Sequence, residues 1–245
     1  MTESLHEITE LSAEQLQRYR GHLSLHEIGY AGQLALARAR VLIVGAGGLG
    51  SPVALYLAAA GVGHIGIVDA DVVSLSNLQR QIIHGTPDVD RPKVESAKES
   101  LAHINPGIEV TTYEQFLTPE NAADIISQYD IVADCTDNLN SRLLVNDVCL
   151  RLSKPYAFGA VSRCFGQVFT HVPGSCTYRD IFGEPKKTDE VSCALNGILN
   201  TVVGVVGTLQ ATEVVKYITG IGQLLTDAML MVDVLTMTFT KLKIR

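Results

Sequence analysis

Residues that could bind an anion gather in the first half of the chain. The segment Gly45-Ala46-Gly47-Gly48-Leu49-Gly50 follows an apolar run at 41–44 and leads into a stretch rich in small residues. In a glycine turn between a strand and a helix, the first glycine permits the turn, the second admits a phosphate, and the last permits close packing. The first turn of the helix then favours an anion. We therefore expect Gly45, Gly47, Gly48 and Gly50 to bind a nucleotide, with an empty glycine turn as the alternative.

Polar side chains able to hold the rest of a nucleotide follow this turn. Asp69 ends a second apolar run, at roughly the 20-residue distance at which this arrangement places a carboxylate on a ribose hydroxyl. Asn77, Arg80 and Gln81 come next, and Lys93 follows an Arg-Pro pair. Arginine offers phosphate a planar fork, and lysine offers a compact charge. Two cations favour a triphosphate, and the alternative is a solvated helix face.

Two further positions carry reactive side chains. Asp137 lies in the sequence DCTDN, at the carboxyl end of a strand predicted at 131–134, where ligands bind in open α/β sheets. It could instead cap a helix expected over 138–152. Cys193 precedes a predicted helix, whose N-terminus can lower the pKa of a thiol, and the equal alternative is a small buried residue. We expect Cys135 to belong to the core.

Alternating strands and helices must position these residues. Strands are expected at 41–44, 65–68, 108–112 and 131–134, with helices after residue 50 and at 93–104 and 119–128. This order predicts an α/β fold with a doubly wound, Rossmann-like, mostly parallel sheet. Strands at 155–160, 166–171, 229–232 and 236–244 would extend it with antiparallel pairs. A helix at 201–217 contains Gly204 and Gly207, which suit a dimer contact.

Length and composition limit the class of protein. A chain of 245 residues can form one large α/β domain, over 1–245, with a helical lead (1–39), a nucleotide-binding core (40–172), a long loop (173–192) and a C-terminal part (193–245). The net charge of −7 argues against nucleic-acid binding. No signal peptide or membrane span is predicted, and the five irregularly spaced cysteines indicate no disulfide framework. We therefore expect a cytoplasmic protein.

The motifs resemble those of the ThiF/MoeB/HesA family, the small bacterial relatives of ubiquitin-activating enzymes. The resemblance covers about residues 18 to 216, and its most specific parts are NLQRQ and DCTDN. It implies adenylation by ATP of the C-terminal glycine of a ubiquitin-like sulfur-carrier protein, of thiamine or molybdopterin type, ending in Gly-Gly. It also implies a homodimer, phosphate contacts from Arg80 and Lys93, and Mg²⁺ bound by Asp137. Cys193 matches a family cysteine linked to sulfur or acyl transfer, and 173–192 matches the crossover loop.

The sequence departs from the family pattern at two places. The family lead R-Y-x-R-Q carries an arginine that reaches the ATP of the other subunit, whereas this chain has Gly21 there, with Arg20 one residue earlier. The family zinc cysteines are also missing, because the sequence TYRD replaces C-Y-R-C and no second pair follows. We therefore expect no zinc. A relative that binds a carrier without adenylating it stays open, whereas an NAD-dependent oxidoreductase would leave Arg80 and Lys93 unexplained.

Overall fold

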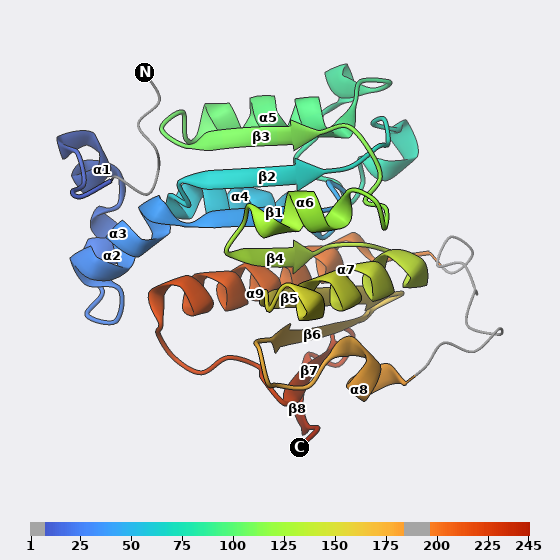
Figure 1. Ribbon diagram of the computed structural model, residues 1–245. Helices are drawn as coiled ribbons and strands as arrows, with labels where there is room; N and C mark the ends of the chain where they lie inside the picture. The colour runs from blue at the N-terminus through green and yellow to red at the C-terminus, as the bar shows by residue number, and fades with distance from the viewer. Residues whose placement is uncertain (1–7, 184–196) are drawn as a thin grey trace.

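The computed structural model describes residues 8–183 and 197–245, and its centre is one eight-stranded sheet of order β3-β2-β1-β4-β5-β6-β7-β8 (Figure 1). The strands are β1 (Arg40–Val44), β2 (His64–Val68), β3 (Glu109–Tyr113), β4 (Ile131–Asp134), β5 (Tyr156–Ser162), β6 (Phe165–His171), β7 (Ala228–Asp233) and β8 (Thr238–Lys243). Strands β3, β2, β1, β4 and β5 are parallel to their neighbours, and β6, β7 and β8 add antiparallel pairs. This arrangement confirms the predicted fold class.

Helices cover both faces of the sheet (Figure 1). They are α1 (Ala13–Arg18), α2 (Arg20–Leu23), α3 (Gly29–Arg38), α4 (Gly50–Ala60), α5 (Lys93–Ile104), α6 (Ala122–Ser127), α7 (Leu139–Arg151), α8 (Tyr178–Phe182) and α9 (Asn200–Thr219), with 3-10 turns at Leu75–Asn77 and Thr86–Asp88. One apolar core lies under α4, α5 and α9, and a second lies under α6, α7 and α8. Within the described ranges, no helix combines the length and apolarity that crossing a bilayer requires.

The order of the strands determines where a ligand can bind. Strand β1 pairs with β2 on one side and with β4 on the other. The chain runs outward from β1 through β2 to β3 and then crosses back to β4, so the strand order reverses beside β1. In open α/β sheets, a crevice forms outside the carboxyl ends of the strands at such a point. The glycine turn follows β1, and the sequence DCTDN begins with the last residue of β4, so both lie at this crevice.

One prediction about the segment 173–192 was wrong. It was expected to lack regular structure, yet Tyr178–Phe182 forms the helix α8. The backbone N–H and hydroxyl of Thr177 donate to Asp180 Oδ2 at 2.9 and 3.0 Å, and Asp180 N–H donates back to Thr177 Oγ1 at 3.2 Å. This reciprocal capping box starts the helix. The two residues that stand at the family's zinc-cysteine positions thus cap a helix, and residues 184–196 lie outside the described part.

Candidate active site

A cavity of about 280 Å³ lies at the crevice outside β1, β2 and β4. Of the predicted site residues, these line it: Gly45, Gly47, Gly48, Asp69, Arg80, Gln81, Lys93 and Asp137. Gly50 and Asn77 lie outside its lining. Cys193 falls outside the described residues, so its role stays a prediction.

The glycine turn takes its shape from close backbone contacts. Gly45 has a φ of +101°, and a Cβ there would lie 2.9 Å from the carbonyl oxygen of Cys135. A Cβ on Gly50 would collide with the carbonyl oxygen of Gly45, so Gly50 lets the first turn of α4 pack against the turn itself. At Gly47, only the side-chain nitrogen of Gln81 would lie within 4 Å of an added Cβ. The backbone of Gly47 is therefore open to a ligand in the cavity.

Asp69 braces the glycine turn from the end of β2. Its Oδ2 accepts a hydrogen bond from Ala46 N–H at 2.8 Å, and its Oδ1 accepts one from Asp71 N–H at 2.8 Å. Burial raises the pKa of Asp69, whereas the positive charge of Lys93 and the two backbone N–H groups lower it. Each carboxylate oxygen has a second lone pair available for a ribose hydroxyl.

The two predicted cations reach the cavity from different elements. Lys93 is the first residue of α5 and is only 4% exposed, and its Nζ lies 2.7 Å from Asp71 Oδ2. Arg80 donates from Nη2 to Asn77 Oδ1 at 3.1 Å, so Asn77 orients the guanidinium instead of lining the cavity. Gln81 is 5% exposed, and its Oε1 has no hydrogen-bond partner among the described residues. This oxygen is itself buried, and the side-chain nitrogen is the atom that lies near Gly47.

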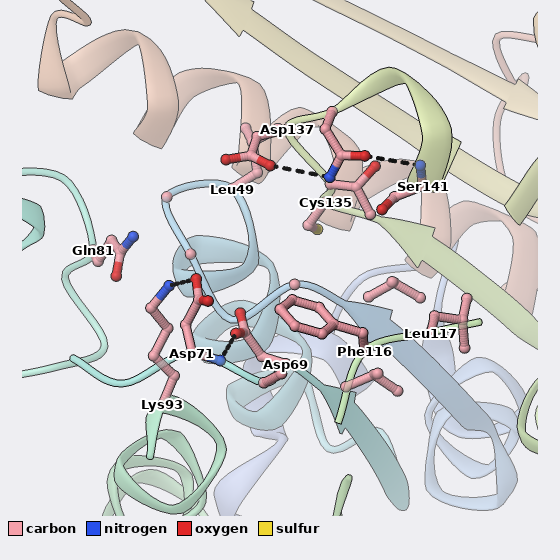
Figure 2. Close-up of a pocket in the computed structure, with 18 of the residues that line it drawn as sticks. Leu49, Asp69, Asp71, Gln81, Lys93, Phe116, Leu117, Cys135, Asp137 and Ser141 are labelled. Carbon is pink, nitrogen blue, oxygen red and sulfur yellow. Dashed lines mark hydrogen bonds and ion pairs between the residues drawn. The ribbon is translucent and has the colours of Figure 1, made fainter. Parts of the chain in front are cut away.

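Asp137 and Asn138 have different roles at the start of α7. Asn138 is the N-cap, because its side-chain oxygen accepts from Ser141 N–H at 2.9 Å. The alternative in which Asp137 caps this helix is therefore wrong. Asp137 is exposed, and its carboxylate accepts only a long contact of 3.5 Å from the Asn138 amide among the described hydrogen bonds (Figure 2). The carboxylate is left available to a ligand.

A single carboxylate at this position fits Mg²⁺ better than a metal held wholly by protein. No group of three or more His, Cys, Asp and Glu side chains within 8–183 and 197–245 is arranged to hold a metal ion. Mg²⁺ is commonly bound through one or two carboxylates together with substrate phosphates and water. The donor set therefore suits a metal that arrives with a phosphate ligand.

A buried glutamine joins α9 to β4 and β5 behind the cavity. Gln210, on α9, is fully buried and donates from Nε2 to the carbonyl oxygens of Asp134 and Ala157, both at 2.8 Å. Its Oε1 accepts a weak bond from the thiol of Cys135 at 3.6 Å. Burial raises the pKa of Cys135 well above its ordinary value. This confirms that Cys135 belongs to the core, where it stays a neutral thiol.

Several residues of the cavity had no assigned role in the sequence analysis. Asp71 pairs with Lys93, while Phe116 and Leu117 enter from the loop after β3. Figure 2 shows Lys93 and Asp71 on one side of Asp69, and Phe116 and Leu117 on the other. The position of Phe116 just beyond a parallel strand was the available signal, because loops at that edge of a sheet line the crevice.

Two curated proteins resemble this chain over nearly its whole length. The probable adenylyltransferase/sulfurtransferase MoeZ of Mycobacterium tuberculosis is 47% identical over 241 residues, which are 96% of this chain and 62% of that protein. The adenylyltransferase and sulfurtransferase MOCS3 of Culex quinquefasciatus is 46% identical, over 97% of this chain and 55% of that protein. The chain thus spans a little over half the length of these relatives.

A solved structure shows the same fold. The crystal structure of Escherichia coli MccB with ATP matches 100% of this chain and 74% of that chain, with a TM-score of 0.81 and 23% sequence identity. In addition, the model of the ThiF family matches residues 19–245, which contain the glycine turn, both cations and Asp137. This protein belongs to the ThiF family.

Proposed function

We propose that this protein uses Mg-ATP to adenylate the C-terminal glycine of a ubiquitin-like sulfur-carrier protein, releasing pyrophosphate. The observation that carries the proposal is the convergence of the glycine turn, two cations and a free carboxylate on one cavity. The names of MoeZ and MOCS3 include an adenylyltransferase activity, which supports the same reaction class.

In the proposed arrangement, each part of ATP has its own group of residues in the cavity. Arg80 and Lys93 would bind the phosphates, and Asp69 would bind the ribose. Phe116, which is 68% exposed, would cover the base together with Leu117. Gln81 would contact the nucleotide from the wall of the cavity with its side-chain nitrogen, and the backbone of Gly47 would approach the phosphates. The solved MccB complex with ATP shares this fold, which supports ATP as the nucleotide.

The chemistry requires positioning and charge neutralisation. A carboxylate oxygen of the terminal glycine forms a bond to the α-phosphorus, and the bond from that phosphorus to the bridging oxygen breaks. Its electron pair leaves with pyrophosphate. The nucleophile arrives already ionised, so no general base is required. Arg80 and Lys93 would stabilise the charge that grows on the departing phosphates, since fixed cations in a partly enclosed site need little rearrangement during reaction.

Asp137 would hold Mg²⁺, which when bound neutralises phosphate charge and fixes the geometry of the triphosphate. The oxygen donor, its exposure and the long contact to Asn138 support this assignment. We further propose that residues 1–245 act as one ATP-binding unit, in a cytoplasmic homodimer whose partner is a carrier ending in Gly-Gly.

The test is exchange of labelled pyrophosphate into ATP by the purified protein with Mg²⁺ and a panel of carriers ending in Gly-Gly. The matched control is the same carrier without its Gly-Gly tail. Tail-dependent exchange would establish the activity and identify the carrier class. ATP binding without exchange for any carrier would overturn adenylation and favour a binding protein. Binding of NAD in preference to Mg-ATP would reject the assignment of the nucleotide.

A further inference from the structure

A buried histidine connects the three elements that carry the predicted phosphate ligands. His84 is 6% exposed and ends the segment that contains Arg80 and Gln81. Its Nε2 lies 2.9 Å from the carbonyl oxygen of Ala46, in the glycine turn. Its Nδ1 lies 2.8 Å from Ser96 Oγ, on α5, the helix that begins with Lys93. One imidazole ring therefore contacts two of these elements and belongs to the third.

The partners of His84 determine which ring nitrogen carries the proton. A carbonyl oxygen only accepts hydrogen bonds, so Nε2 must donate to Ala46. In the neutral ring Nδ1 then accepts, and the Ser96 hydroxyl donates to it. Burial lowers the pKa of His84 from its ordinary value, which keeps the ring neutral near pH 7. The neutral ring thus has one N–H group, and this group donates to the carbonyl oxygen of Ala46 in the glycine turn.

The bond to Ala46 has a geometric consequence for Gly47. The peptide joining Ala46 to Gly47 is planar and trans, so the C=O of Ala46 and the N–H of Gly47 point in opposite directions. The C=O points into the protein at His84, and Gly47 lines the cavity. The N–H of Gly47 therefore points away from His84. A glycine allows its peptide to rotate more freely than other residues do, so such a peptide needs a fixed partner.

We propose that His84 is a positioning residue of the nucleotide site, which holds the Ala46–Gly47 peptide so that the N–H of Gly47 faces the phosphates. Asp69 holds the preceding peptide by accepting from Ala46 N–H at 2.8 Å. The turn is thus fixed on both sides of Ala46, by a carboxylate that accepts and an imidazole that donates. The inference rests on the nucleotide assignment of the proposed function, and it does not require that adenylation follows.

Two substitutions separate the hydrogen bond from packing. In His84→Gln, the side-chain amide nitrogen can occupy the place of Nε2 and donate to Ala46. In His84→Asn, the shorter side chain places its amide near Nδ1, so it can contact Ser96 but cannot reach Ala46. Both variants keep a polar side chain of moderate size. Ser96→Ala is the matched control, because it removes the other contact of the ring and leaves the bond to Ala46.

The measurement is the dissociation constant of Mg-ATP by calorimetry, with adenosine measured by competition. We expect His84→Asn to weaken the binding of Mg-ATP about tenfold or more. The peptide would no longer be held, so the hydrogen bond from Gly47 N–H to a charged phosphate would be lost, and such a bond has roughly that effect. Adenosine affinity should change less than about twofold, because adenosine has no phosphate to meet Gly47. His84→Gln should recover most of the ATP affinity, and Ser96→Ala should stay within about threefold of the unmodified protein.

Three results would overturn the proposal. These are unchanged ATP affinity in His84→Asn, an equal loss of ATP and adenosine affinity, and a His84→Gln variant that binds ATP no better than His84→Asn. A purely structural role predicts the second pattern or a lower melting temperature alone. Absence of pyrophosphate exchange in the unmodified protein, with ATP binding intact, would reject the proposed adenylation and leave the comparison of ATP with adenosine fully informative.

Discussion

Replacement of Lys93 by methionine removes a positive charge and keeps an unbranched side chain of similar length. The ammonium group is buried beside the cavity, and it lies 2.7 Å from Asp71 Oδ2. If it binds the phosphates as proposed, its loss removes a fixed charge from the site of reaction. Removal of one such preorganised group costs about 10²- to 10³-fold in rate, or roughly 2.7 to 4 kcal/mol.

The same substitution should have little effect on stability. The side chain of Asp71 is 57% exposed, so its carboxylate stays hydrated once the ion pair is gone, and the large penalty for leaving a buried charge unpaired does not apply to it. Lys93 is also the first residue of α5, where the helix dipole disfavours a cation by about 0.3 to 1 kcal/mol. The two effects oppose each other, so we expect a melting temperature within about 4 °C of the unmodified protein.

Pyrophosphate exchange and thermal unfolding, measured on the same preparation, test this prediction. Lys98→Met is the control, since Lys98 is an exposed residue of the same helix and does not line the cavity. We expect normal exchange in Lys98→Met and a loss of at least about a hundredfold in Lys93→Met. Exchange within about threefold of normal in Lys93→Met would refute the role of its charge. A large drop in melting temperature would show that Lys93 mainly supports the fold.

Three further predictions follow from other residues. Asp137→Asn should reduce Mg²⁺-dependent exchange about a hundredfold and leave ATP binding without Mg²⁺ unchanged, measured by calorimetry with EDTA; equal losses in both would contradict a role in metal binding. Gly21→Ala should raise the free energy of unfolding in urea by about 0.5 to 1 kcal/mol, because Gly21 lies inside α2 with nothing within 4 Å of an added Cβ. Burial lowers the pKa of His171 from 6.5, so the unfolded chain binds more protons and stability falls as the pH drops through that value. The melting temperature of His171→Gln should therefore change less between pH 7.5 and 5.5 than that of the unmodified protein, and an equal change in both would exclude His171 as a source.

The elements with strong local signals were predicted closely. Helix α5 was expected at 93–104 and runs from Lys93 to Ile104. Pro92 marks its start, because proline has no backbone N–H and is tolerated only at the beginning of a helix. The sequence Asn105-Pro106-Gly107 ends it. The glycine turn between β1 and α4 was likewise readable, since a φ of +101° at Gly45 requires a glycine. Where the local backbone geometry requires one residue type, that residue predicts the local structure.

Three features were not predicted correctly: the N-cap of α7, the helix α8 and the place of Phe116 in the cavity. Asp137 and Asn138 are both good N-caps, and only the backbone at Asn138, with φ −127° and ψ 152°, decides between them. The helix α8 was overlooked although Thr177 and Asp180 have the spacing of a capping box. Phe116 lines the same cavity as Asp69 because β3 pairs with β2, so its place there follows from the sheet and not from its neighbours in sequence.

The bonds of Gln210 make the two sides of the cavity differ in stiffness. On one side, this buried side chain joins α9 to the ends of β4 and β5, so the segment leading to Asp137 starts from a point that three elements hold in common. On the other side, Phe116 lies on a loop and is 68% exposed. A movement of the site that admits a nucleotide should therefore occur at the Phe116 loop, whereas the backbone at the end of β4, which leads to Asp137, should stay in place.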